Sequence, residues 1–139
     1  MKEALALLFM IVAVLLLSNG LQGYDRTYDI AYGALTVMAA MISGTFLWLW
    51  STRATPLALG MACSWAGAAS VMGWWWTYSV AGAPAAMKDA ALLFVFLALY
   101  FVGAILHFLV IQRSMGLGSR AFLWPVCAAL VIATAVSML

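Results

Sequence analysis

The sequence predicts an all-α fold, a polytopic bundle of transmembrane helices. Of its 139 residues, 68% are hydrophobic and only 7% are charged. A soluble domain carries roughly 25% charged residues because its surface must be solvated. The apolar residues also fall in continuous runs, and about 20 such residues cross the hydrocarbon as a helix. We therefore expect residues 1–139 to form a single transmembrane helical domain without a separate soluble domain.

Five apolar runs qualify as membrane spans. They cover approximately residues 4–21, 30–50, 57–81, 90–111 and 121–139. The connectors STRATP, GAPAAMKDA and QRSMGLGSR hold most of the remaining proline and charge, as turns do. A closed β-barrel would instead need alternating segments of about ten residues, which these continuous runs do not resemble.

The first run has a second interpretation, a cleaved signal peptide, because Lys2 precedes an apolar stretch. Against this interpretation, LLLSNGLQG contains no A-x-A-like cleavage site, and the run is long for the apolar core of a signal peptide. We favour a retained helix, which gives five transmembrane helices. Removal of the first helix would leave four.

We predict a bacterial inner-membrane protein, and the distribution of Lys and Arg favours a cytoplasmic N-terminus and an outer C-terminus. In this orientation the cytoplasmic side holds Lys2, Arg53, Arg113 and Arg120, and the outer side holds Arg26 and Lys88. Short cytoplasmic loops carry an excess of basic residues, so the larger group belongs inside.

The third run is the richest in small residues. Its four-residue pairs include Gly60 with Ser64 and Ala69 with Gly73, and these pairs cover several helix faces. Transmembrane helices associate where small residues let their backbones approach. We therefore expect the third helix to lie at the centre. Trp65 sits near mid-membrane in this run, and a buried indole N–H there needs an acceptor on a neighbouring helix.

The stretch GYDRTYDIAYG, residues 23–33, places aromatic and acidic groups at the outer end of the second span. Tyr24, Tyr28 and Tyr32 recur at every fourth residue, with two aspartates beside them. Trp75, in the motif WWWTY, is expected at the same depth. Aromatic faces next to carboxylates attract cations, but aromatic rings also anchor proteins at membrane interfaces. We favour the anchor interpretation.

The inner edge of this stretch is the part best suited to a binding site. Asp29 and Tyr32 continue at helical spacing into Thr36 and Ser43 of the second span. Residues three or four apart share one face of a helix. The spacing therefore predicts a narrow polar seam that runs from the outer surface into the membrane.

His107 is the only histidine in the chain and the only readily ionisable side chain within a predicted span. Ionisable groups within a membrane are costly, so each is a functional hypothesis by default. We favour a neutral imidazole hydrogen-bonded to a Ser, a Thr or a backbone carbonyl of a facing helix. A proton or substrate relay is the next interpretation, and haem ligation would need a second axial ligand from another chain or a Met. Tyr100 lies on the same helical stripe.

The sequence contains no catalytic or metal-binding motif. One His, two Cys within apolar runs and no carboxylate within a span make no recognised metal set. Ser64 and Ser70 lack a base on their own helix. The net charge of +2 is too small to indicate nucleic acid as a partner. We predict neither catalytic nor metal-binding residues, and the cofactor stays unknown.

These observations favour a non-catalytic subunit of a larger membrane complex or of a homo-oligomer. Its partners are the lipid bilayer and other membrane subunits or copies of itself. The alternative is a small-solute or cation transporter or channel with an outer aromatic and acidic vestibule. The candidate ligand-binding residues are Asp29, Tyr32, Thr36, Ser43, Trp65, Trp75, Tyr100 and His107.

In its size, its five predicted spans and its seven tryptophans, the chain resembles the tryptophan-rich sensory (translocator) proteins. The resemblance is one of composition, because that family's aromatic and proline signature is not found here. No residue role is carried over from that family.

Overall fold

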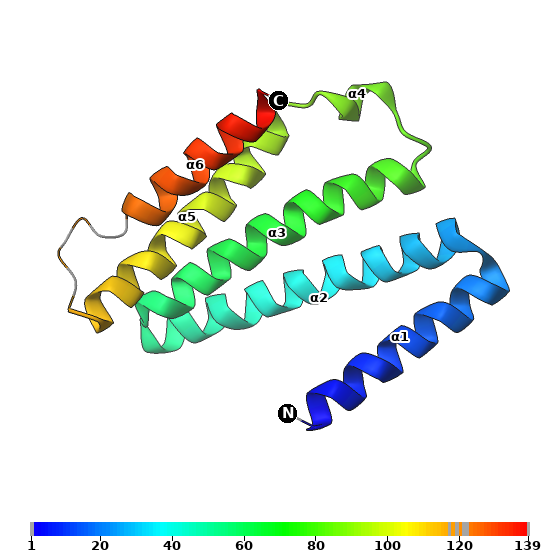
Figure 1. The fold of residues 1–139 in the computed structure, drawn as a ribbon, viewed down its shortest axis with the longest axis horizontal. Coiled ribbons are helices and arrows are strands. Elements are labelled where there is room, and N and C mark those ends of the chain that lie inside the picture. Colours follow the sequence, from blue (N-terminus) through cyan, green and yellow to red (C-terminus); the bar gives the residue numbers. More distant parts are fainter. Residues whose placement is uncertain (1, 117, 119, 121–122, 139) are drawn as a thin grey trace.

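The computed structural model describes residues 2–116, 118, 120 and 123–138, and it confirms an all-helical chain, with no strand in this part. The helices are α1 (Lys2–Gln22), α2 (Tyr24–Arg53), α3 (Pro56–Val80), α4 (Ala85–Lys88), α5 (Leu92–Ser114) and α6 (Leu123–Ser137), as Figure 1 shows. Four stretches of the described chain are long and apolar enough to cross a membrane, namely α1, α2, α3 and the segment Ala85–Ser114. The apolar helix α6 is shorter, at 15 residues.

The start of α2 differs from the sequence prediction. The helix begins at Tyr24, about six residues before the predicted start near residue 30. A single residue, Gly23, separates α1 from α2, and its φ of 85° is a conformation that glycine adopts without steric cost. Asp25 lies in the first turn of α2, where the helix dipole favours negative charge. The charged residues of this stretch therefore lie on a helix end, as the spacing of the tyrosines and aspartates predicts, and only the start of the apolar span lies later.

The other predicted boundaries lie closer to the observed ones. Helix α3 matches the third predicted span to within one residue at each end, and α5 begins and ends two to three residues after the fourth. The fifth predicted span, residues 121–139, is described only over Leu123–Ser137, because residues 121–122 and 139 lie outside the described part.

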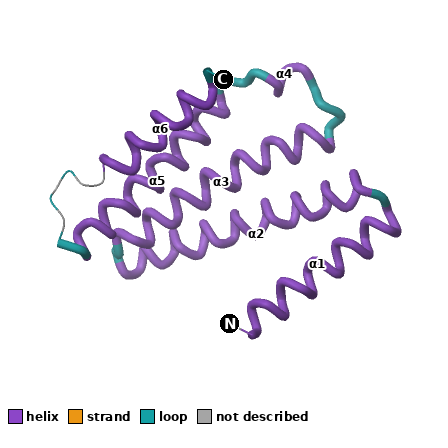
Figure 2. The backbone as a smooth tube through the Cα atoms, viewed as in Figure 1, coloured by secondary structure: helices purple, strands orange, loops and turns teal. Residues whose placement is uncertain are grey.

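Helices α2 and α3 form an antiparallel hairpin, which is visible in the backbone trace of Figure 2. Ala54 ends α2 in the left-handed conformation, with φ of 48°, and its N–H donates to the Trp50 carbonyl at 2.7 Å. Pro56 then opens α3, where a missing N–H costs little because the first turn has no intrahelical acceptor for it. This short turn sets the two long helices side by side.

Helix α3 lies between α2 and α5 and packs extensively against both, which confirms its predicted central position (Figure 1). Helix α1 makes a smaller contact with α2, and no comparable contact involves α6 within the described residues. The buried hydrophobic residues are all alanines, namely Ala39, Ala58 and Ala62. This is the composition expected where helix backbones approach one another closely in place of large interlocking side chains.

Two glycines bring the backbones of α3 and α5 into direct contact. A Cβ added to Gly67 of α3 would lie 2.7 Å from Cα of Tyr100. A Cβ added to Gly103 of α5 would overlap the backbone and the hydroxyl of Ser64. These two contacts set how α3 is rotated against α5, and they determine which side chains meet beside them.

Candidate functional site

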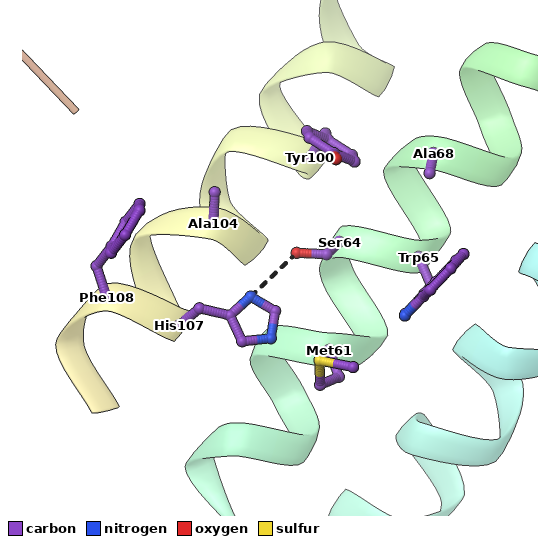
Figure 3. Close-up of a pocket in the computed structure, with 8 residues that line it drawn as sticks. All are labelled: Met61, Ser64, Trp65, Ala68, Tyr100, Ala104, His107 and Phe108. Carbon is purple, nitrogen blue, oxygen red and sulfur yellow. Dashed lines mark hydrogen bonds between the residues drawn. The ribbon is translucent and has the colours of Figure 1, made fainter. Parts of the chain in front are cut away.

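A groove of about 330 Å³ lies between α3 and α5, next to this glycine contact (Figure 3). Helix α3 contributes Met61, Ser64, Trp65 and Ala68 to its lining, and α5 contributes Tyr100, Ala104, His107 and Phe108. Within each set, residues three or four positions apart lie on the same side of the helix, so each set occupies one helix face. The groove is therefore built from two facing helix stripes.

Ser64 and His107 are the polar pair of this groove. The Ser64 Oγ lies 3.4 Å from Nδ1 of His107, a long hydrogen-bond distance, drawn as a dashed line in Figure 3. Either atom is able to donate, depending on the imidazole tautomer. The sequence favours a His107 imidazole that is hydrogen-bonded to a residue of a facing helix. Ser64 on α3 is such a residue.

The other imidazole nitrogen of His107 is buried without a partner. Nε2 makes no hydrogen bond to any of the described residues, and it is shielded from solvent. A buried polar atom without a partner costs about 1–3 kcal/mol. The imidazole therefore has hydrogen-bonding capacity that the described part of the chain does not use.

Three of the eight predicted binding residues come together in the groove: Trp65, Tyr100 and His107. Trp65 is half-buried, and its indole N–H makes no hydrogen bond within the described residues. The side chain of Tyr100 is 47% exposed, while its backbone packs under Gly67. The other five predicted residues are not part of the groove lining.

The hydroxyls of Thr36 and Ser43 in the predicted seam on α2 bond within the protein, and the seam does not join the groove. Thr36 donates to the carbonyl of Tyr32, one turn earlier, at 2.9 Å. Ser43 donates across to the carbonyl of Ala62 on α3, also at 2.9 Å. The seam therefore stabilises the α2–α3 hairpin, and Ser43 supplies its link between the helices.

At the other end of the hairpin, Asp29 accepts a hydrogen bond from Ser79 Oγ at 2.9 Å. This contact joins the first turns of α2 to the last turns of α3. Trp75 is 39% exposed and packs edge-to-face with Tyr78, with ring centroids 5.5 Å apart. Asp29 and Trp75 therefore lie near the end of the hairpin opposite the Ser64–His107 pair.

The three tyrosines of α2 form a continuous stack, as their four-residue spacing predicts. The rings of Tyr24 and Tyr28 lie 6.0 Å apart at an interplanar angle of 20°, and those of Tyr28 and Tyr32 lie 5.5 Å apart at 13°. The prediction that these residues share one stripe of a helix end is confirmed. The stack presents aromatic faces along the first turns of α2.

Sequence reasoning missed two partners that the structure reveals. Ser64 was compared only with its own helix, whereas its partner His107 lies 43 residues further along the chain. Ser79, the partner of Asp29, lies 50 residues away from it. The one available indication was Gly103, a turn before His107, which marks the stripe of α5 that is able to approach another backbone.

The residues that line the groove carry two hydroxyls, one imidazole and one indole N–H among otherwise apolar side chains.

No protein family, curated protein or solved structure matches the chain. The described residues contain no group of three or more metal-ligating side chains. A serine nucleophile needs a base that is held in place by a third group, and Nε2 of His107 has no such partner in the described chain.

Proposed function

We propose that the chain is a multi-pass inner-membrane protein that acts as a non-catalytic subunit of a larger membrane complex or of a homo-oligomer. The observation that supports this proposal is the uneven packing of its helices. Every buried residue within the described helices belongs to α2, α3 or α5, whereas α1 and α6 bury none. Apart from the contact of α1 with α2, these two helices therefore present most of their surfaces to the surroundings.

The surface of α6 carries small residues as well as large apolar ones. Ala129 and Ala133 are exposed and lie four positions apart on one face. Small residues at this spacing permit the close backbone approach by which transmembrane helices associate. Such a face supports contact with a helix of another subunit, while the large apolar side chains around it suit lipid.

Within this proposal the helices form a five-span bundle with a cytoplasmic N-terminus. Arg53 and Arg113 lie in the last turns of α2 and α5, which run in the same direction because α3 returns between them. Arg26 and Lys88 precede the apolar parts of these two helices and so belong to the opposite side. With Lys2 and Arg120 added to the first group, the basic excess supports a cytoplasmic location for the ends of α2 and α5.

The test of the subunit role is a mass measurement on the tagged chain, extracted from its own membranes in a mild detergent. We expect a defined assembly with more than one chain. Ala129→Leu with Ala133→Leu should release monomers, because the larger side chains block close approach on α6. Gly44→Ala on α2 is the matched control, since an added Cβ there meets nothing within 4 Å.

Transport of a small solute or cation is the second candidate function. It is supported by the half-buried carboxylate of Asp29 on the same helix end as the stacked tyrosines, because aromatic faces and carboxylates both attract cations. Asp29→Asn and His107→Ala should then abolish uptake of an aromatic cation probe, ethidium, into vesicles without changing expression or assembly. Uptake that both changes leave intact would exclude this role.

A further inference from the structure

The groove between α3 and α5 joins a hydrogen-bonding pair to flat aromatic surfaces. Ser64 and His107 supply the hydrogen-bonding pair, and Trp65, Tyr100 and Phe108 supply rings (Figure 3). We propose that this groove binds a neutral, planar ring compound that bears a carbonyl or hydroxyl oxygen and dissolves in the bilayer, as a quinone headgroup does. This binding role is independent of the proposed subunit role.

The lining of the groove favours a neutral ligand. None of the described residues that line it carries a fixed charge. A charged ligand in an apolar environment needs an opposite charge to offset its desolvation, and the groove provides none among these residues. The facing pair of Ser64 and His107 instead matches a single carbonyl or hydroxyl oxygen.

The size and walls of the groove favour a planar ring. Its volume of about 330 Å³ lies at the lower end of the range of about 300–1,000 Å³ that small-molecule pockets occupy. Aromatic side chains prefer offset-stacked or edge-to-face contacts with other rings. One bicyclic ring system therefore suits the space better than a bulky or branched molecule.

The position of the polar pair favours a ligand from the membrane. Ser64 lies about 12 Å along α3 from its start at Pro56, at a rise of about 1.5 Å per residue. His107 lies about 10 Å before the end of α5 at Ser114, by the same rise. These depths fall within a hydrocarbon layer about 30 Å thick. A molecule that reaches the pair thus partitions into the bilayer first.

The weak contact between Ser64 and His107 favours an oxygen-bearing ring over a plain hydrocarbon. The distance from Ser64 Oγ to Nδ1 of His107 is long at 3.4 Å, so both groups are poorly satisfied by each other. A ligand oxygen that accepts a hydrogen bond from the serine hydroxyl or from the imidazole replaces this weak contact with a shorter one. The ligand preference should therefore depend on both residues.

The experiment compares two probes of nearly equal shape, 2,3-dimethyl-1,4-naphthoquinone and 2,3-dimethylnaphthalene. Both ring positions next to the quinone carbonyls are methylated, so the probe does not add to the thiol of Cys63. Binding is measured by equilibrium dialysis with the full chain in lipid nanodiscs, and empty nanodiscs correct for partitioning into lipid. We expect saturable binding of the quinone at least about tenfold tighter than that of the hydrocarbon, a ratio that corresponds to one or two net hydrogen bonds.

Four variants locate the binding. Ser64→Ala and His107→Leu should each reduce the preference for the quinone by about three- to tenfold, the value of one net hydrogen bond. Ala104→Leu should abolish saturable binding of both probes, because it fills the groove. Ser79→Ala, outside the groove on the same helix as Ser64, should change nothing. Helicity and elution volume confirm that each variant folds.

Several results would overturn the proposal. Binding no greater than that of empty nanodiscs excludes the site, and equal affinity for the two probes excludes a role for the polar pair. A preference that survives in both Ser64→Ala and His107→Leu places the quinone elsewhere on the chain.

Discussion

Gly33 of α2 lies directly under the indole ring of Trp76 on α3: a Cβ built on Gly33 would come within 2.5 Å of Cε2 of that ring. Such a distance is shorter than any ordinary carbon–carbon contact, so the ring occupies the space that glycine leaves free. This contact lies near the start of α2 and the end of α3, and the Asp29–Ser79 hydrogen bond lies one turn closer to that open end of the hairpin. The absence of a side chain at residue 33 is therefore a packing requirement.

We expect Gly33→Ala to destabilise the hairpin by about 1–3 kcal/mol, as overpacking of a tight contact does. A smaller ring should relieve the conflict, so the loss should shrink by about 0.5 kcal/mol or more when Trp76→Phe is also present. SDS titration followed by circular dichroism gives the four stabilities of this cycle. Additive effects would show that residue 33 and the ring are not in contact.

The contact between Gly103 and Ser64 makes a similar prediction for α3 and α5. Gly103→Ala should lower stability by about 1–3 kcal/mol, because the added methyl group would meet backbone atoms that have little room to move. Gly44→Ala makes the same chemical change at a helical site with open space, and it should be neutral or slightly stabilising. Equal losses in the two variants would contradict the close approach of α3 and α5.

Ser43 provides a test of the polar seam. Its hydroxyl donates from α2 to the Ala62 carbonyl of α3, and hydrogen bonds between transmembrane helices average about 0.6 kcal/mol. Ser43→Ala should cost about this much. Ser51→Ala is the control, since the Ser51 hydroxyl donates to a carbonyl of its own helix and is exposed. If the Ser43→Ala protein is as stable as the Ser51→Ala control, the hydrogen bond from Ser43 to α3 does not stabilise the hairpin.

The orientation is testable at two exposed serines that end the hairpin, Ser51 and Ser79. In a background with Cys63→Ser and Cys127→Ser, each is replaced by cysteine and treated with a membrane-impermeant maleimide in intact cells. Ser79→Cys should react and Ser51→Cys should react only after lysis, because the proposed orientation puts Ser79 outside and Ser51 in the cytoplasm. The reverse pattern would show that the topology is inverted. Equal reaction at both sites would show that α2 and α3 do not cross the membrane.

Much of the fold was predictable because hydropathy and a few turn residues determine where the helices lie. Pro56 and the apolar run after it locate α3 to within a residue, since proline suits a first helical turn. The predicted span began near residue 30 because hydropathy marks the start of the apolar run, whereas the helix already begins at Tyr24, with the charged residues in its first turns. A helix end in water tolerates such charges, and one glycine with positive φ is enough to separate two helices.

The candidate site was predictable only in part, because helical periodicity describes each helix alone. The spacing of Tyr100 and His107 places them on one stripe of α5, but it does not say which stripe of α3 faces them. Gly67 and Gly103 decide that rotation through backbone contacts between residues far apart in sequence. For this reason the pairing of Ser64 with His107 emerged only from the folded chain.

The central claim is that α1 and α6, which bury none of their residues within the chain, are covered by other subunits or other copies. Native mass spectrometry of the tagged chain, released from its own membranes in a mild detergent, tests this claim most directly. We predict a defined assembly in which the chain is bound to unrelated subunits or to a fixed number of its own copies. A stable, folded monomer as the sole species in several mild detergents would contradict the claim.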